Sequence, residues 1–121
     1  MNINFFTINL LDITESLFFY RDTLGLKVVR DFCPTDFMRI VFLQGEGTGQ
    51  IELIENKIMK QGVQGNYNVS IGIKVLDISS VFQKMQDKGV TITRNMLNMP
   101  HGPKMFFIKD PNGIEVEFIQ E

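Results

Sequence analysis

The chain has 121 residues, of which 44% are hydrophobic and 21% are charged, and its formal net charge is −2. This length is typical of one ordinary domain, and the apolar content is enough for a core. A single cysteine, Cys33, excludes an internal disulfide framework and CxxC zinc sites. The apolar runs are too short to span a bilayer, the first residues lack the pattern of a signal peptide, and basic residues do not cluster. We therefore expect a cytoplasmic protein that binds neither membranes nor nucleic acid.

An internal repeat divides this single domain into two modules. When the sequence is aligned with itself, segment 8–14 matches 73–79 and segment 51–55 matches 116–120, both at the same offset. Two segments at opposite ends of each half share this offset, which indicates a duplication. We expect module 1 over residues 1–55, a glycine-containing linker over 56–67, and module 2 over 68–121.

The first module begins with alternating apolar and polar residues over 3–11, the pattern of a half-buried strand. Apolar residues at helical spacing follow, with Asp12 as the predicted N-cap and Gly25 at the carboxyl end of the helix. Three further strands are expected, at residues 26–33, 37–44 and 49–55.

The second module repeats this order. A strand is predicted over 69–76, and a helix between Asp77 and Gly89. Strands follow near 90–96, at 104–109 and at 114–120, and the last two are joined by the turn Asp110-Pro111-Asn112-Gly113. The pattern predicts an α+β fold in which the unit βαβββ occurs twice.

One helix in each module covers only one face of its sheet, so the composition of the other face is informative. On the first strand of each module, this other face carries mixed residues, namely Phe5, Thr7 and Asn9 in one module and Ser70, Gly72 and Lys74 in the other. Such a surface suggests a ligand cavity. The alternative is an α+β sandwich whose outer face meets water. We favour the cavity because glutamates recur on that face at equivalent positions.

Two motifs resemble a known superfamily. The segment Phe19-Tyr20-Arg21-Asp22-Thr23-Leu24-Gly25-Leu26 resembles the "FYrdvLGl" signature of the vicinal oxygen chelate superfamily. The segment 107–118 resembles its closing "f-x-DPdGn-x-iEl" motif. The superfamily includes glyoxalase I, extradiol dioxygenases and bleomycin resistance proteins. The resemblance implies an incompletely closed eight-stranded sheet around a cavity, the glyoxalase/bleomycin resistance fold, and a homodimer.

Most enzymes of that superfamily hold a divalent metal with residues from the first and last strands of each module. The resemblance maps these places onto Phe5, Glu52, Ser70 and Glu117, and both equivalent pairs have the offset of the repeat. Family enzymes usually have histidine, glutamine or glutamate at the two first-strand places. A phenyl ring has no lone pair, and a serine hydroxyl is a poor ligand for zinc or nickel. We therefore expect no cofactor. The alternative is a divalent metal (Mn, Mg, Ni or Zn) held weakly by Glu52 and Glu117 with water.

Two functional hypotheses follow from the resemblance and these departures. The first is a metal-independent protein of the bleomycin-resistance type that binds a small molecule. The residues predicted to line its pocket are Phe5, Thr7, Ser70, Met99, His101 and Met105. The second is a lyase or isomerase of the glyoxalase I type, rather than a dioxygenase, in which Glu52 and Glu117 are catalytic or hold the metal. His101, the one histidine of the chain, is also compatible with an ordinary exposed loop residue.

Overall fold

The computed structural model describes residues 1–58, 69–98, 100 and 102–121. The chain divides into two compact units, Met1–Gln64 and Gly65–Glu121, and each is described here by itself. The predicted linker over 56–67 falls largely outside the described residues, as do Met99 and His101.

The first unit contains one mixed sheet and one helical segment. Its strands stand in the order β1-β4-β3-β2, with β1 parallel to β4 and the other pairs antiparallel. The elements are β1 (Phe5–Leu10), α1 (Ile13–Leu17), the π-helical turn η1 (Phe18–Thr23), β2 (Lys27–Thr35), β3 (Met38–Gln44) and β4 (Gln50–Asn56).

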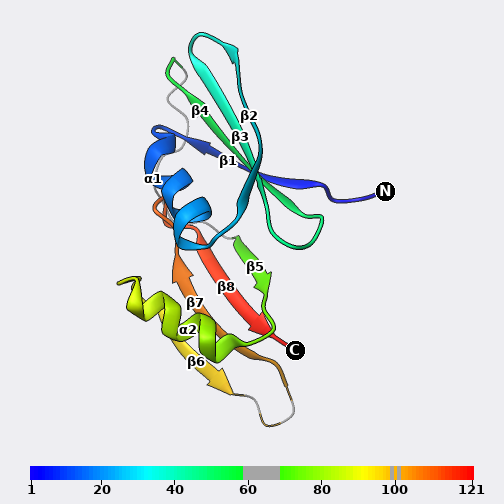
Figure 1. Ribbon diagram of the computed structural model, residues 1–121, viewed down its shortest axis with the longest axis vertical. Helices are drawn as coiled ribbons and strands as arrows, with labels where there is room; N and C mark the ends of the chain where they lie inside the picture. Colours follow the sequence, from blue (N-terminus) through cyan, green and yellow to red (C-terminus); the bar gives the residue numbers. More distant parts are fainter. Residues whose placement is uncertain (59–68, 99, 101) are drawn as a thin grey trace. The chain divides into compact units, whose positions relative to one another are not determined.

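The second unit has the same topology, with its strands in the order β5-β8-β7-β6. Its elements are β5 (Ser70–Lys74), α2 (Ile78–Asp87), β6 (Arg94–Asn98), β7 (Lys104–Lys109) and β8 (Glu115–Gln120). Figure 1 shows α2 lying across one face of this sheet. The predicted α+β class and the doubled βαβββ unit are confirmed. The eight strands form two four-stranded sheets, one in each unit.

The strand register preserves the offset of the sequence repeat. In the first sheet Thr7 is paired with Glu52, and in the second Gly72 is paired with Glu117. Both members of the second pair follow their counterparts in the first at the offset of the repeat. A duplication of the whole supersecondary unit, rather than a chance likeness of two segments, accounts for this agreement.

Both helical segments begin with the same two interactions. Asp12 accepts a hydrogen bond from the Thr14 N–H at 2.8 Å, and Asp77 accepts one from the Ser80 N–H at 3.2 Å. The first helical N–H of each segment is bound by the last strand: Ile13 donates to Glu55 Oε2 at 2.9 Å, and Ile78 donates to Gln120 Oε1 at 2.8 Å. These contacts satisfy donors that have no partner within the helix, which fixes where each helix starts.

The helix ends agree with the prediction in position but not fully in form. Gly25 and Gly89 have φ values of +80° and +74°, the left-handed conformation that ends a helix and that glycine adopts without strain. The first segment was expected to be α-helical throughout, but it becomes a π-helix at Phe18. The strand predicted near 90–96 begins only at Arg94, because the Val90 N–H still binds Met85 O at 2.9 Å and closes the helix.

The core of each unit lies between its helix and the facing side of its sheet. Ile8, Leu10 and Leu53 are buried there, as the alternation predicted, although Phe6 on the same face is 37% exposed. In the second unit Phe106 is buried against Phe118, with stacked rings 4.8 Å apart. Throughout the described part of the chain, no helix has the length and apolar content needed to cross a membrane.

Candidate functional site on the open sheet faces

The side of each sheet that faces away from its helix is called its open face. One cross-strand row of paired residues runs over the open face of the first sheet, from the edge strand β2 to β1. This first row consists of Arg30, Phe42, Glu52 and Thr7. A basic, an aromatic, an acidic and a hydroxyl side chain therefore stand next to one another on four adjacent strands.

Glu52 is held in place within this row. The Thr7 hydroxyl donates a hydrogen bond to Glu52 Oε1 at 2.6 Å, and both side chains are half-buried. Bonds from a hydroxyl to an ionised carboxylate are short and roughly twice as strong as neutral ones. Thr7, predicted only to line a pocket, thus fixes the carboxylate, while the other oxygen of Glu52 is available to a ligand group.

Three aromatic side chains lie close together on the first open face, and Arg30 contacts two of them. Phe42 is buried, and the ring of the exposed Phe5 meets it edge-on with centroids 5.6 Å apart. The Arg30 guanidinium lies 4.7 Å from the centre of the Phe32 ring and 5.3 Å from that of Phe42. Arg30 is therefore held by aromatic rings at the β2 edge of the open face.

The second row consists of Arg94, Phe107, Glu117 and Gly72. Arg94 stacks over the buried Phe107 at 3.7 Å and also forms an ion pair with Glu115 at 2.6 Å. A Cβ atom built at Gly72 would meet nothing within 4 Å. Gly72 stands where the first unit has Thr7, so Glu117 lacks the hydroxyl donor that holds Glu52.

The other predicted pocket residues are distributed as follows. Ser70 is exposed at the start of β5, paired with Glu115. Met105 is half-buried on β7 between Leu97 and Ile119. Met99 and His101 lie outside the described residues.

Sequence reasoning missed Arg30, Phe42, Arg94 and Phe107. Phe42 and Phe107 are related by the offset of the repeat, so the repeat contained a signal for them. The arginines are 64 residues apart, as Gly25 and Gly89 are, so the repeat pairs them only when one residue is skipped. Both reach their rings where the strand register shifts, between Val28 and Arg30 and between Arg94 and Leu97. A β-bulge of this kind re-aims a side chain and is not visible in an alternating pattern.

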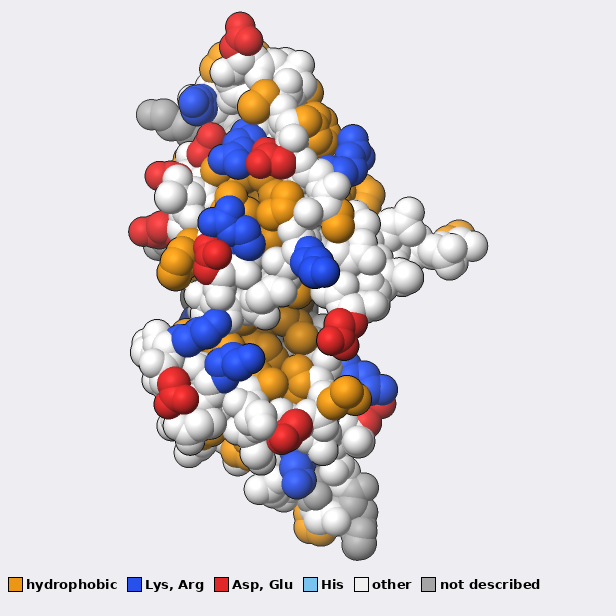
Figure 2. Space-filling model, in the orientation of Figure 1, with side chains coloured by type: hydrophobic (Ala, Val, Ile, Leu, Met, Phe, Trp, Pro, Cys, Tyr) orange, Lys and Arg blue, Asp and Glu red, His pale blue; other side chains and the backbone are white. Residues whose placement is uncertain are grey.

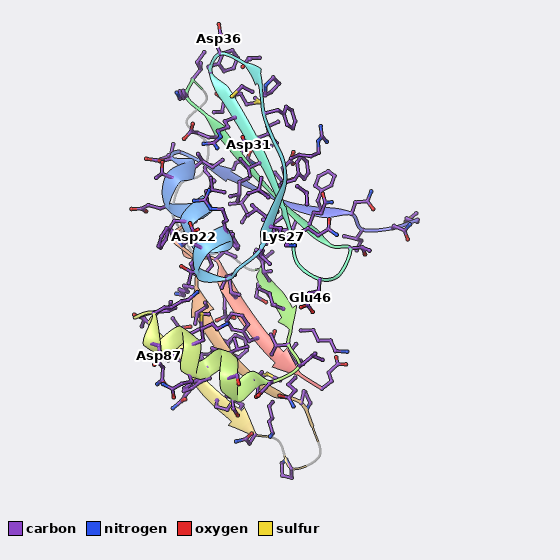
Figure 3. All side chains as sticks on the ribbon, viewed as in Figure 1. Asp22, Lys27, Asp31, Asp36, Glu46 and Asp87 are labelled. Atoms are coloured by element: carbon purple, nitrogen blue, oxygen red, sulfur yellow. The ribbon has the colours of Figure 1, made fainter. Side chains whose placement is uncertain are left out.

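The remaining arginines of the first unit are paired with aspartates. Arg21 binds Asp22 at 2.9 Å, and Arg39 binds Asp31 at 2.7 Å. The hydrogen bond from Arg39 lowers the pKa of the Asp31 carboxyl group. Figure 2 shows basic and acidic side chains next to one another over this unit, in the upper part of the view. Asp22 and Asp31 are labelled in Figure 3.

The residues do not fit the metal site that the resemblance implies. Phe5 has no atom that can ligate a metal, and Ser70 offers only a neutral hydroxyl, a poor ligand for zinc or nickel. Among residues 1–58, 69–98, 100 and 102–121, no three histidine, cysteine, aspartate or glutamate side chains are grouped so that they could hold an ion. A transition-metal centre of the usual composition is therefore not provided by these positions.

Comparisons with known proteins agree with the fold. A family model described as the Glyoxalase/Bleomycin resistance protein/Dioxygenase superfamily matches residues 2–118. A probable lactoylglutathione lyase of Synechocystis is 33% identical over 90% of this chain and 87% of that protein. A superfamily member from Sphaerobacter thermophilus superposes with a TM-score of 0.83 at 25% identity, over 100% of this chain and 98% of its own. A trypanothione-dependent glyoxalase I of Leishmania major superposes with a TM-score of 0.78 at 27% identity, over 100% of this chain and 87% of its own.

Proposed function

Because the chain belongs to the Glyoxalase/Bleomycin resistance protein/Dioxygenase superfamily, we propose that it is a small-molecule-binding member that lacks the usual metal site. The observation that carries the proposal is the replacement of a ligating side chain by Phe5, whose ring packs against Phe42 beside Glu52. Aromatic surface with a few fixed polar groups is typical of sites that bind small organic molecules.

The proposed ligand site uses the open faces. The exposed ring of Phe5 supplies apolar contact and is supported by the buried Phe42. Thr7 holds Glu52, and the other oxygen of Glu52 accepts a hydrogen bond from the ligand. On the open face of the second unit, Ser70, Met105 and Glu117 are proposed to bind a ligand. Met99 and His101, which were also predicted to line the pocket, lie outside the described residues.

The absence of a tight metal site is tested by elemental analysis of protein purified without chelators, followed by titration with Ni²⁺, Zn²⁺ and Mn²⁺. We expect clearly substoichiometric metal in the wild type and weak binding at most. If the wild type holds stoichiometric metal and Glu52→Gln does not, the proposal is wrong. Glu55→Gln is the matched control, because Glu55 lies on the same strand but binds the Ile13 N–H.

A gain-of-function variant tests whether the missing histidines explain the absence of a tight metal site. Phe5→His together with Ser70→His restores the residue type that family enzymes usually have at the first-strand places. Imidazole is a good ligand for zinc and nickel. We expect this variant to bind more metal than the wild type in the same titration. If it binds no more metal than the wild type, the side chains at these two positions are not what limits metal binding.

A second candidate function is favoured by the relatives. The Synechocystis relative is named a probable lactoylglutathione lyase, and one of Neisseria meningitidis, 29% identical, is named a lactoylglutathione lyase. In this alternative the chain is a lyase or isomerase of the glyoxalase I type, and Glu52 and Glu117 are its acid and base. The test measures formation of lactoylglutathione from methylglyoxal and glutathione. Activity abolished by Glu52→Gln or Glu117→Gln, but kept by Glu55→Gln, would establish the alternative.

We also propose a homodimer in the cytoplasm, since members of the superfamily commonly dimerise. Light scattering on the purified protein measures the mass directly. A value near twice 13.9 kDa is expected, and a monomer at micromolar concentration would contradict it.

A further inference from the structure

Arg30 differs from the other arginines of this chain. Arg21, Arg39 and Arg94 each bind a carboxylate, at distances of 2.9, 2.7 and 2.6 Å. None of the ion pairs formed by the described residues includes Arg30, and the segments outside the description, 59–68, 99 and 101, contain no aspartate or glutamate. The charge of Arg30 is therefore not neutralised within its unit.

The Arg30 side chain is nevertheless held in one place. Its guanidinium carbon lies over the Phe32 and Phe42 rings, at 4.7 and 5.3 Å from the ring centres. A cation attracted to ring faces is held by contacts that do not use up its hydrogen-bond donors as a carboxylate would. An arginine held by aromatic rings loses little conformational entropy when an anion binds.

We infer that Arg30 binds a carboxylate of the ligand, and that the ligand's apolar body lies against the exposed ring of Phe5, which packs on Phe42. The inference rests on the proposed function for the location of the ligand and adds its chemical class, a small organic acid. Arg30 and Glu52 are on strands two apart, so about 10 Å separates their backbones. The ligand's uncharged polar end then reaches Glu52, with the carboxylate at the other end.

The charges on the first open face favour a carboxylate over a phosphate. The fork of Arg30 fits both groups, but a phosphate ester carries nearly two negative charges. Glu52 on the same row repels additional negative charge. The other cation on this face, Lys27, is exposed at the start of β2 and is labelled in Figure 3. A single fixed cation therefore matches a singly charged group.

The test uses benzoate as the probe, with benzyl alcohol as its neutral analogue and phenyl phosphate as the dianion. Binding to chelator-treated protein is followed by amide chemical shifts and by the arginine Nε–H resonances. We expect saturable shifts on β2 to β4 with benzoate and weaker binding of both analogues. Arg30→Gln is expected to weaken benzoate binding about tenfold or more, and Arg30→Lys by less.

Arg94 supplies a matched control, because it also stacks on a phenylalanine but is already paired with Glu115. We expect Arg94→Gln to change benzoate affinity less than about twofold. Glu115→Gln is expected to release Arg94 and to create a second benzoate site with shifts on β6 to β8. If Glu115→Gln creates no such site, the ion pair is not what distinguishes the two arginines.

Several results would overturn the inference. The first is that benzoate shows no saturable binding. The second and third are that benzyl alcohol binds as tightly as benzoate, or that phenyl phosphate binds more tightly than benzoate. The fourth is that Arg30→Gln and Arg94→Gln weaken benzoate binding equally. Unchanged melting temperatures show that the variants are folded. If Arg30→Gln does not fold, Arg30→Lys still tests the role of Arg30. Because no metal is present in this assay, its failure is distinct from failure of the metal analysis that tests the proposed function.

Discussion

The Thr7 hydroxyl donates to Glu52 Oε1 across 2.6 Å and links β1 to β4 on the face away from α1. Thr7→Val removes the donor and keeps the shape of the side chain. Because the acceptor is a carboxylate, we expect the free energy of unfolding to fall by about 1 to 2 kcal/mol. Urea denaturation of Thr7→Val, Glu52→Met and the double variant measures the coupling energy, because methionine has no oxygen to accept the bond. A coupling near zero would mean that the bond contributes nothing in solution.

The second unit offers the reverse substitution as a control. Gly72 has the place of Thr7, and a Cβ there meets no atom within 4 Å. Gly72→Thr therefore introduces a β-branched residue into open space beside Glu117, and we expect a gain of about 0.5 to 1 kcal/mol. A loss of stability would show that the strand needs glycine at this position.

The duplicated fold could be predicted from sequence because its signals are local and regular. The alternation along β1, the caps Asp12 and Asp77, and Gly25 and Gly89 all lie where the pattern placed them. The π-helical turn was not predicted, since the apolar spacing of residues 13–24 also fits an α-helix.

The site could be predicted only in part. Glu52 was placed on the correct face, but its pairing with Thr7 depends on the strand register, which a single strand does not reveal. The contacts of Arg30 and Arg94 depend on irregular strand positions. The contact of each arginine with a phenylalanine ring depends on the pairing of two neighbouring strands.

Glu55 and Gln120 perform the same task with different chemistry, since each accepts the first helical N–H of its unit. Glu55→Gln keeps an acceptor oxygen, and Gln120 shows that an amide suffices. We expect it to cost at most about 0.5 to 1 kcal/mol, the contribution of a negative charge near a helix N-terminus. Glu55→Leu leaves the N–H of the buried Ile13 without its acceptor and is expected to cost about 1 to 3 kcal/mol. Equal losses in thermal unfolding of both variants would contradict this explanation.

Asp77 makes the stability of the second unit dependent on pH. The hydroxyl and then the N–H of Ser80 hydrogen-bond to its carboxylate and hold its pKa below the ordinary value of 3.8. A lowered folded-state pKa means that this contribution is fully present above the unfolded-state pKa and is lost as the pH falls through the folded-state value. Asp77→Asn still caps the helix but does not titrate. We expect its melting temperature to fall less than that of the wild type between pH 5 and pH 2, while a parallel decline would exclude Asp77 as a contributor.

Asp110 organises the turn between β7 and β8 from a buried position. Its Oδ1 accepts the N–H groups of Asn112 and Ile114, each at 2.8 Å, and its Oδ2 accepts Asn112 Nδ2 at 3.0 Å. Asp110→Asn retains one acceptor but turns a donor toward the Asn112 amide, so we expect a loss of about 1 to 3 kcal/mol. Exchanging the two residues, Asp110→Asn with Asn112→Asp, restores a donor facing an acceptor. Chemical denaturation should therefore show that the double variant recovers most of the loss. If it is as unstable as Asp110→Asn alone, the negative charge at position 110, rather than the pattern of donors and acceptors, holds the turn together.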